Sequence, residues 1–389
     1  MMSLRGIKCL DVTHQIAGPW TTELLADLGA EVIKIENPIG GDTSRNYPFF
    51  GSAVFATENR GKKSVTLNLK SEKGKEIVTK LTQQSDIFVE NFTPGLLDKL
   101  GLGYDDLKKV NRRLIYCSIS GFGKSPNENR PAWDAALQAM SGLMTVTGEP
   151  DRPPMRVGTS IVDLTAGNYA LNGILLALLE REKSGEGRFV DISLFDSAIS
   201  LVNYWIAYSS ITGKVPSRMG NEWPALAPYQ VFKAKNGEYV FIGASNDEFW
   251  KKLCEVLQLG DLAIDEKFSS NERRVLNMKK LTAIIDETTE SWDRDELVER
   301  LVQQGIPCAP VNTVSELLDD PSLVKRGIII ETSYETTGNF RAAGSPLRAF
   351  GPAQTGIGPP KLGQHTDEIL RELEYEDSEI EEFHRDGTV

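Results

Sequence analysis

Residues 7–35 read IKCLDVTHQIAGPWTTELLADLGAEVIKI, and this stretch decides the fold. It predicts a buried strand at Ile7–Val12, a helix from about Trp20 to Leu28 and a second strand at Glu31–Ile35. A strand, a helix and a strand in this order predict a parallel sheet. Ligands bind at the carboxyl ends of the strands in such sheets, so the turn His14–Gly18 is a candidate ligand contact. An ordinary tight turn has the same local sequence, and the stretch taken alone favours that interpretation.

Further strands alternate with helices downstream. The expected strands are Ser64–Leu69, Asp86–Glu90, Leu114–Ile119 and Arg188–Leu194. After Glu90, Thr93 is expected to cap a helix that has Pro94 in its first turn, which places Asn91 between a strand end and a helix start. The fold class predicted for this part of the chain is therefore α/β with a parallel sheet.

The character of the sequence changes after residue 211. Residues 212–228 show little regular pattern and are expected to be a linker. Tyr229–Phe232 and Tyr239–Ile242 then predict a β-hairpin that turns at Lys235-Asn236-Gly237. We expect a large domain over 1–211, a smaller α+β domain over 229–327, and a return to the large domain over 328–389 that ends in one acidic helix at Asp367–Phe383.

The composition restricts the class of protein. The chain has 389 residues, 40% of them hydrophobic, and a net charge of -12. The acidic balance argues against a nucleic-acid binder, which normally has a basic face. The four cysteines include no CxxC pair and the three histidines form no metal-binding pattern, so we expect a reduced, cytoplasmic protein without a metal site. No secretory signal precedes the first strand, and the apolar run Leu171–Leu179 is too short to span a membrane.

A second informative stretch is Met155–Ala170, which reads MRVGTSIVDLTAGNYA. It predicts a short strand, a tight loop and a long apolar helix, with Asp163 at the join. An Asp at such a boundary is usually an N-cap that accepts bonds from the first N–H groups of the helix. The alternative is a carboxylate held in an apolar setting and used as a nucleophile. Spacing alone does not choose between the two.

Ordered segments along most of the chain resemble the class III CoA transferases, also called the CaiB/BaiF family. The segments that carry the resemblance are 11–19 (DVTHQIAGP), 28–36 (LGAEVIKIE), 59–64 (NRGKKS), 89–92 (VENF) with 94–95 (PG), 120–123 (SGFG), 141–144 (SGLM), 157–163 (VGTSIVD) and 362–366 (LGQHT). The resemblance implies a large Rossmann-like domain built from both chain ends and a small domain inserted between them. It also implies an interlocked homodimer, in which each chain is threaded through the ring of the other.

The resemblance also implies an activity. Asp163 matches the catalytic aspartate of the family, which attacks an acyl-CoA thioester to form a mixed anhydride. The CoA thiolate then converts this anhydride to an aspartyl-CoA thioester, from which a carboxylate acceptor takes the CoA. The positions implied to contact CoA are His14, Gln15, Ile16, Ala17, Leu67, Lys70, Asn91, Phe92 and Lys99. Lys99 stands where transferases of the family often have arginine, so it keeps the positive charge but loses the bidentate geometry.

Two departures from the family pattern narrow the expected activity. The racemases of the family use a His-Asp pair before the catalytic aspartate, and this chain has Trp133-Asp134; tryptophan cannot carry a proton, which disfavours racemisation. Some oxalate-specific members carry a run of glycines in the small domain, and 212–244 contains none. We therefore expect transfer of CoA from an acyl-CoA, with succinyl-CoA a common donor in the family, to a small carboxylic or dicarboxylic acid.

Two other functions stay open from the sequence. The first is a 2-methylacyl-CoA racemase or epimerase that uses a different acid–base pair. The second is a non-catalytic CoA-binding protein in which Asp163 only caps a helix. Exchange of the α-proton would identify the racemase, and a pure binder would not exchange free CoA with acyl-CoA.

Overall fold

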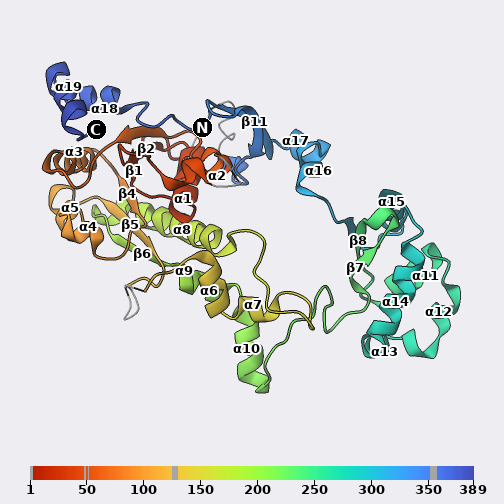
Figure 1. Cartoon of the computed structure of the whole chain (residues 1–389). Coiled ribbons are helices and arrows are strands. Elements are labelled where there is room, and N and C mark those ends of the chain that lie inside the picture. The colour runs from red at the N-terminus through yellow and green to blue at the C-terminus, as the bar shows by residue number, and fades with distance from the viewer. Residues whose placement is uncertain (1–2, 48–49, 51, 125–129, 351–356) are drawn as a thin grey trace. The chain divides into compact units, whose positions relative to one another are not determined.

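The computed structural model describes residues 3–47, 50, 52–124, 130–350 and 357–389. The chain forms two compact units (Figure 1). Unit 1 consists of Met1–Leu143, Val157–Ile211 and Leu318–Val389, and unit 2 of Met144–Arg156 and Thr212–Leu317. Unit 1 is thus assembled from both ends of the chain.

The centre of unit 1 is a six-stranded sheet in which every pair of neighbouring strands is parallel. Its strands are β1 (Lys8–Asp11), β2 (Glu31–Glu36), β3 (Lys63–Thr66), β4 (Ile87–Glu90), β5 (Ile115–Ser120) and β6 (Phe189–Ser193). They lie in the order β3-β2-β1-β4-β5-β6, which is the order of a Rossmann-type sheet. The α/β class and the parallel sheet expected from residues 7–35 are confirmed.

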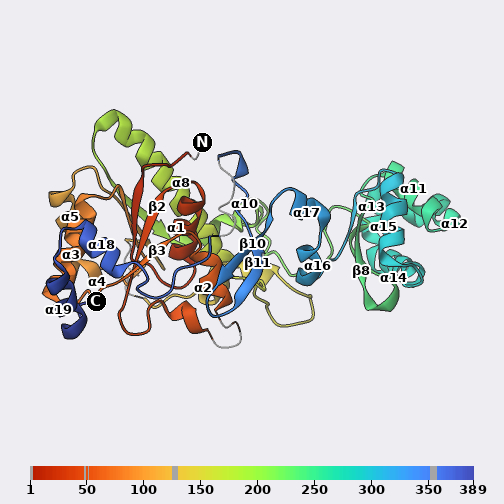
Figure 2. The same cartoon turned by 90° about the horizontal axis from the view of Figure 1, so that it is seen from above.

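Helices cover both faces of this sheet, which is why its strands are apolar on both sides (Figure 2). On one face lie α1 (Ala17–Asp27), α6 (Asp134–Met140), α8 (Ile161–Ser184) and α9 (Leu194–Ser200). On the other lie α3 (Glu72–Gln83), α4 (Leu96–Lys99), α5 (Tyr104–Val110), α18 (Thr366–Glu372) and α19 (Asp377–Asp386).

Helices α1 and α8 approach each other closely because Gly167 has no side chain. A Cβ atom at this position would lie 2.7 Å from Cδ1 of Trp20 and 2.8 Å from the carbonyl oxygen of Ala17. Thr21 Oγ1 sits at the same crossing and donates to the Ala17 and Gly167 carbonyls. The start of α1 is therefore fixed against the helix that carries Asp163.

The remaining elements of unit 1 are helices and one antiparallel pair of strands. They are η1 (Thr43–Asn46), α2 (Ala53–Glu58), α10 (Asn203–Thr212), α17 (Pro321–Lys325), the antiparallel pair β10 (Ile329–Tyr334) and β11 (Gly338–Ala343), and η4 (Arg348–Phe350). The returning chain also pairs with edge strand β3. His365 N–H donates to the Ser64 carbonyl (2.9 Å), and Ser64 N–H donates to His365 Nδ1 (3.1 Å).

Unit 2 is an α+β unit with a three-stranded antiparallel sheet in the order β7-β8-β9. Its elements are α7 (Leu143–Val146), β7 (Tyr229–Lys233), η2 (Lys235–Gly237), β8 (Tyr239–Gly243), α11 (Asp247–Val256), α12 (Gly260–Ile264), η3 (Glu266–Phe268), α13 (Asn271–Leu276), α14 (Met278–Thr289), α15 (Arg294–Gln303), β9 (Cys308–Pro310) and α16 (Val314–Leu318). The expected hairpin is confirmed, and Asn236 at its turn has a φ of 61°. Helices α11, α14 and α15 pack around Trp250 in one apolar core.

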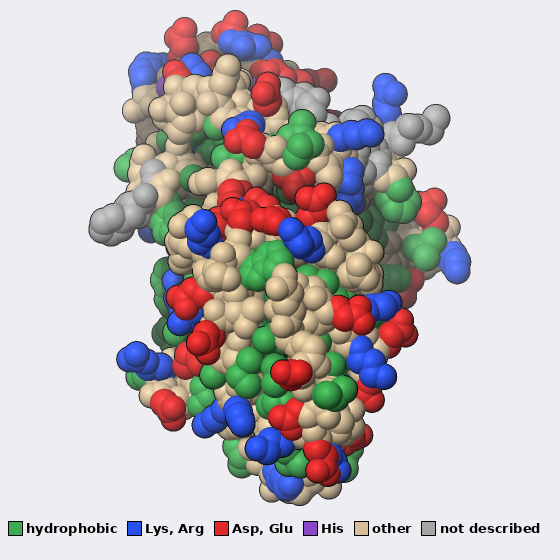
Figure 3. Space-filling model, turned by 90° about the vertical axis from the view of Figure 1, so that its right-hand side faces the viewer, with side chains coloured by type: hydrophobic (Ala, Val, Ile, Leu, Met, Phe, Trp, Pro, Cys, Tyr) green, Lys and Arg blue, Asp and Glu red, His purple; other side chains and the backbone are tan. Residues whose placement is uncertain are grey.

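Three local predictions were wrong. The helix after β4 begins at Leu96 rather than at Pro94, because Gly95 at a φ of 80° is its N-cap. The single acidic helix expected at 367–383 is two helices, and Glu374 at a φ of 65° lies in the break. Finally, the length argument at Leu171–Leu179 was wrong, because these residues belong to the 24-residue helix α8, which is long and apolar enough to cross a membrane by length and composition alone. Within unit 1, α8 packs against α1, β5 and β6. Acidic and basic side chains are interspersed on the face drawn in Figure 3.

Candidate active site

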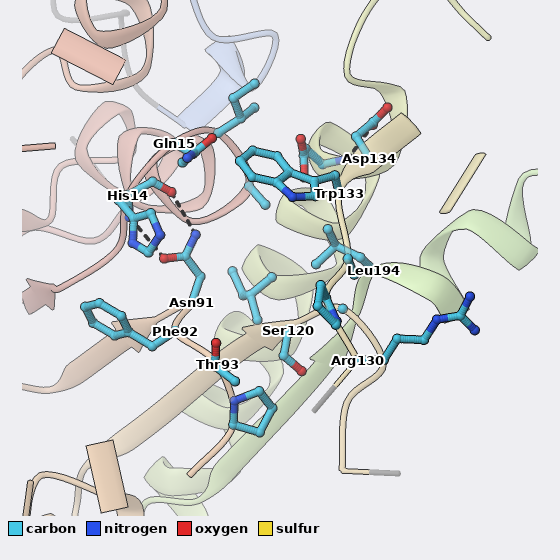
Figure 4. A pocket seen from close by; sticks show the side chains of 18 of the residues that line it. His14, Gln15, Asn91, Phe92, Thr93, Ser120, Arg130, Trp133, Asp134 and Leu194 are labelled. Carbon is cyan, nitrogen blue, oxygen red and sulfur yellow. Dashed lines mark hydrogen bonds between the residues drawn. The ribbon is translucent and has the colours of Figure 1, made fainter. Parts of the chain in front are cut away.

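The site lies at the carboxyl ends of β1 and β4, where the strand order reverses and where ligands bind in sheets of this kind. Two hydrogen bonds join the segments that leave these strands (Figure 4). His14 N–H donates to Asn91 Oδ1 (3.0 Å), and Asn91 Nδ2 donates to the His14 carbonyl (2.8 Å). The His14 ring packs against Phe92 with 5.3 Å between ring centroids. Burial lowers the pKa of His14, which favours the neutral imidazole at pH 7.

Buried ionisable side chains hold the turn that follows β1 in place. Asp11, the last residue of β1, accepts bonds from Thr13 N–H (2.9 Å) and from Lys62 Nζ (2.9 Å). Lys34 Nζ donates to the Thr13 carbonyl (2.7 Å) and pairs with Asp42 (3.0 Å). Burial raises the pKa of Asp11, but Lys34, Lys62 and its hydrogen bonds outweigh burial and hold that pKa well below the ordinary range. The turn therefore rests on buried, paired ionisable groups.

Gln15 is held in a left-handed backbone conformation with a φ of 73°. This conformation is unusual for a side chain other than glycine or asparagine. Two contacts maintain it: Gln15 N–H donates to Asp42 Oδ1 (3.1 Å), and the Tyr47 hydroxyl donates to Gln15 Oε1. Tyr47 thus occupies the amide oxygen of Gln15, and no described residue accepts a hydrogen bond from its Nε2 donor.

Asp163 lies in the first turn of α8, two residues after the first helical residue Ile161. The predicted strand before it is absent; residues 155–160, which are described, have no regular structure. Its predicted use as an N-cap is wrong too, because Ser160 occupies the N-cap position and Asp134 accepts the N–H groups of Val162 (2.7 Å) and Asp163 (3.2 Å). Among the described residues, no group donates a hydrogen bond to the Asp163 carboxylate.

The electrostatics of Asp163 follow from this placement. Burial, and secondarily the negative charge of Asp134, raise its pKa from an ordinary value of 3.8 to about 7. A carboxylate that receives no hydrogen bond from a described residue and has a pKa near 7 is about half ionised at neutral pH, and its ionised form is weakly stabilised, which suits a nucleophile.

Two pockets open at this edge of unit 1. The first, of about 420 Å³, is lined by His14, Gln15, Ile16, Ala17, Asn91, Phe92, Thr93, Pro94, Leu96, Ile119, Ser120, Gly121, Arg130, Pro131, Ala132, Trp133, Asp134, Asp163 and Leu194. The second, of about 470 Å³, is lined by Ile35, Glu36, Asn37, Pro38, Ile39, Leu67, Asn68, Leu69, Lys70, Phe92, Leu96, Leu97, Leu100 and Gly387. Phe92 and Leu96 line both, so the two pockets adjoin.

The structure distributes the predicted site residues over these pockets. Asp163 and six of the positions expected to contact CoA line the first, namely His14, Gln15, Ile16, Ala17, Asn91 and Phe92. Leu67, Lys70 and again Phe92 line the second. Lys99 is exposed on α4 and lines neither pocket, although its neighbours Leu97 and Leu100 line the second. Within the described residues, no group of three His, Cys, Asp or Glu side chains is arranged to hold a metal ion.

Sequence reasoning missed two functional candidates. Tyr47 fixes the Gln15 amide, and Asp134 caps α8 while lining the first pocket. Tyr47 lies in a long loop without periodic pattern, so no local signal marked it. Asp134 was noted only beside Trp133, where the racemases of the family have their His-Asp pair, and its capping of α8 was not predicted.

Comparisons with known proteins agree with this geometry. The family model described as CoA-transferase family III matches residues 4–366. The human succinyl-CoA:glutarate CoA-transferase is 37% identical and is covered over 90% of its length by 99% of this chain. The acetyl-CoA:oxalate CoA-transferase of Acetobacter aceti is 38% identical over 95% of both chains. A solved CaiB/BaiF family protein from Brucella suis has a TM-score of 0.89 and 38% identity, over 96% of this chain and 99% of that chain.

Proposed function

The chain belongs to CoA-transferase family III, and from that premise we propose that Asp163 is the nucleophile that carries CoA from an acyl-CoA to a small carboxylic or dicarboxylic acid. The observation that supports this proposal most is the environment of the Asp163 carboxylate. The carboxylate lines a pocket formed at the switch point of the sheet, receives no hydrogen bond from a described residue and has a pKa of about 7.

The proposed reaction consists of four exchanges at three carbonyl groups, those of the donor, of Asp163 and of the acceptor. The Asp163 carboxylate attacks the donor thioester, which releases the CoA thiolate and forms a mixed anhydride. The thiolate attacks the Asp163 carbonyl, so that the donor acid leaves and an aspartyl thioester remains. The acceptor carboxylate then displaces CoA, and the thiolate finally attacks the acceptor carbonyl and regenerates the Asp163 carboxylate. No proton is gained or lost overall, which agrees with a site whose histidine is held neutral by burial.

We propose that CoA occupies both pockets, with its thioester end beside Asp163. The second pocket has an apolar lining that suits the adenine ring, and exposed Lys70 at its rim can meet a phosphate. The first pocket brings Gln15 Nε2 to the side of the thioester, where it can donate to the oxygen that becomes negative during attack.

We propose a short dicarboxylate as the acceptor and succinyl-CoA as a donor. The relatives described above are named for dicarboxylates, glutarate in one case and oxalate in the other. The chain carries a net charge of -12, so a dianion needs local donors. The Gln15 amide and the neutral His14 imidazole in the first pocket are such donors.

Trapping of the intermediate tests the proposal. The protein is mixed with succinyl-, acetyl- or glutaryl-CoA, treated with hydroxylamine, digested and analysed by mass spectrometry. We expect a hydroxamate on the peptide that contains Asp163, and none with Asp163→Asn, which keeps the shape of the side chain but is no nucleophile. Intact CoA binding without any hydroxamate would refute the proposal. Deuterium uptake at the α-carbon of a 2-methylacyl-CoA would then be measured, because it reports the racemase alternative.

We further propose that the enzyme is an interlocked homodimer. Helices α8 and α10 expose large apolar side chains, among them Leu176 (62%), Leu179 (60%) and Ile211 (83%). Apolar side chains gathered on two helices of one unit are typical of a protein interface. Sedimentation of the wild type should give a dimer, and Leu176→Asp should shift it toward the monomer. A monomeric wild type at micromolar concentration would contradict the proposal.

A further inference from the structure

Helix α8 begins without a cap of its own. The side chain of its N-cap residue, Ser160, makes no capping hydrogen bond. Asp134 supplies the cap from α6, because its Oδ2 accepts the N–H groups of Val162 (2.7 Å) and Asp163 (3.2 Å). These are the second and third residues of the helix, whose N–H groups a cap ordinarily satisfies.

Asp134 is itself held in place by a fully buried glutamine. Its Oδ1 accepts from Gln138 Nε2 (2.6 Å), and Gln138 Oε1 accepts the N–H of Val157 (2.8 Å). The two side chains of α6 therefore bind the connecting segment at Val157 and the start of α8 at the same time. Rotation of the Asp134 carboxylate would release two backbone N–H groups and the Gln138 amide.

Because Asp134 caps α8, the Asp163 side chain does not cap the helix. The backbone N–H that an Asp in the first turn could approach is taken by Asp134, and both carboxylates line the same pocket. We propose that Asp134 is a positioning residue that caps α8 from outside the helix and, through its negative charge, keeps the Asp163 carboxylate directed into the pocket and reactive. This inference rests on the proposed nucleophilic role of Asp163.

Among the charged groups around Asp163, Asp134 is the one whose charge raises the pKa of Asp163. His14, Arg130 and Asp134 line the pocket with Asp163, and Arg130 extends away from His14 and Asn91 in Figure 4. Tyr47 and Glu58 also interact electrostatically with Asp163, and burial is the main reason that the pKa of Glu58 rises to about 8. Glu58 is therefore mostly neutral at pH 7. Burial and the charge of Asp134 are the two causes of the raised pKa of Asp163.

Two variants separate the cap from the charge. Asp134→Asn keeps an oxygen for the α8 amides and removes the charge, but its new amide group faces the amide of Gln138. The double variant Asp134→Asn/Gln138→Glu restores that contact, because a carboxylate in place of the Gln138 amide would accept from both the new amide and the Val157 N–H. It also moves the negative charge one side chain away from Asp163. Asp320→Asn is the matched control: Asp320 caps α17 with one oxygen on two N–H groups (2.8 and 2.9 Å) and lines neither pocket.

The test is hydroxylamine trapping with succinyl-CoA as the probe, measured from pH 5 to 8.5. Hydroxylamine itself titrates identically in all samples, so only differences between variants are read. For the wild type and Asp320→Asn we expect half-maximal trapping near pH 7. In Asp134→Asn and the double variant the midpoint should fall by about one pH unit, and the plateau rate should fall because the nucleophile is less basic.

The outcomes distinguish this inference from the proposed function. No hydroxamate on Asp163 in the wild type would overturn both. A wild-type hydroxamate with the same pH midpoint in the folded Asp134 variants would overturn the role of Asp134 alone. If Asp134→Asn does not fold, the double variant, which restores the hydrogen bonds of the cap, decides the question. Thermal unfolding and CoA binding identify the folded variants.

Discussion

Asp163→Asn should stabilise the protein, and the gain should grow as the pH rises. The pKa of Asp163 is about 7 in the folded protein against an ordinary value of 3.8. Between these two values the folded state holds the proton that the unfolded chain has released, so the wild type loses stability as the pH rises through this window. A difference of about three pH units corresponds to roughly 4 kcal/mol at 1.36 kcal/mol per unit. Asp163 is only partly shielded from solvent, so we expect about 1–3 kcal/mol.

The assay compares the two proteins in urea or thermal unfolding from pH 4.5 to 8.5 without CoA. The stability difference between Asp163→Asn and the wild type should widen up to about pH 7 and then level off. Asp106→Asn removes a carboxylate from an exposed pair with Lys109 and serves as the control that should follow the wild type. A difference that is constant with pH, or that narrows as the pH rises, would refute the reasoning about burial and the charge of Asp134.

Three further predictions concern the residues that support the site. Asn91→Leu removes both hydrogen bonds to the turn after β1 and should raise KM for the acyl-CoA about 5- to 50-fold, more than it lowers kcat, in steady-state assays. Gly167→Ala should lower the free energy of unfolding by about 1–3 kcal/mol, because its Cβ would meet α1, whereas Gly158→Ala, which has open space around it, should change it by less than about 0.5 kcal/mol. Lys34→Met removes the buried cation that pairs with Asp42 and one of the two cations beside Asp11, and should cost about 3–5 kcal/mol, whereas Lys63→Met at a partly exposed network should cost less than about 1 kcal/mol; equal losses in urea unfolding would contradict the burial argument.

The sheet and the place of the site could be predicted because they follow from short-range patterns. Apolar strands alternate with helices along residues 7–120, and this alternation predicts a parallel sheet with ligands at its carboxyl edge. The turn at His14 and the segment at Asn91 each follow a strand, so their meeting at that edge could be expected.

The start of α8 could not be predicted in the same way. Its cap is supplied by Asp134, which lies 29 residues before Asp163, and no local rule for helix starts includes an acceptor from another helix. The local sequence alone therefore suggested that Asp163 is the N-cap residue of this helix. The break between α18 and α19 at Glu374 was not predicted for a related reason. A residue other than glycine in the left-handed conformation carries no distinctive sequence signal.

The pairing of Ser64 with His365 has a consequence for synthesis on the ribosome. Strand β3 is an edge strand, and the segment that covers it follows 301 residues later. At about 5–20 residues per second, translation leaves this edge uncovered for roughly 15–60 s. An unpaired strand edge is a template for association with other chains. The nascent protein should therefore depend on chaperones during this interval, and premature stop codons before His365 should yield aggregated rather than merely inactive protein.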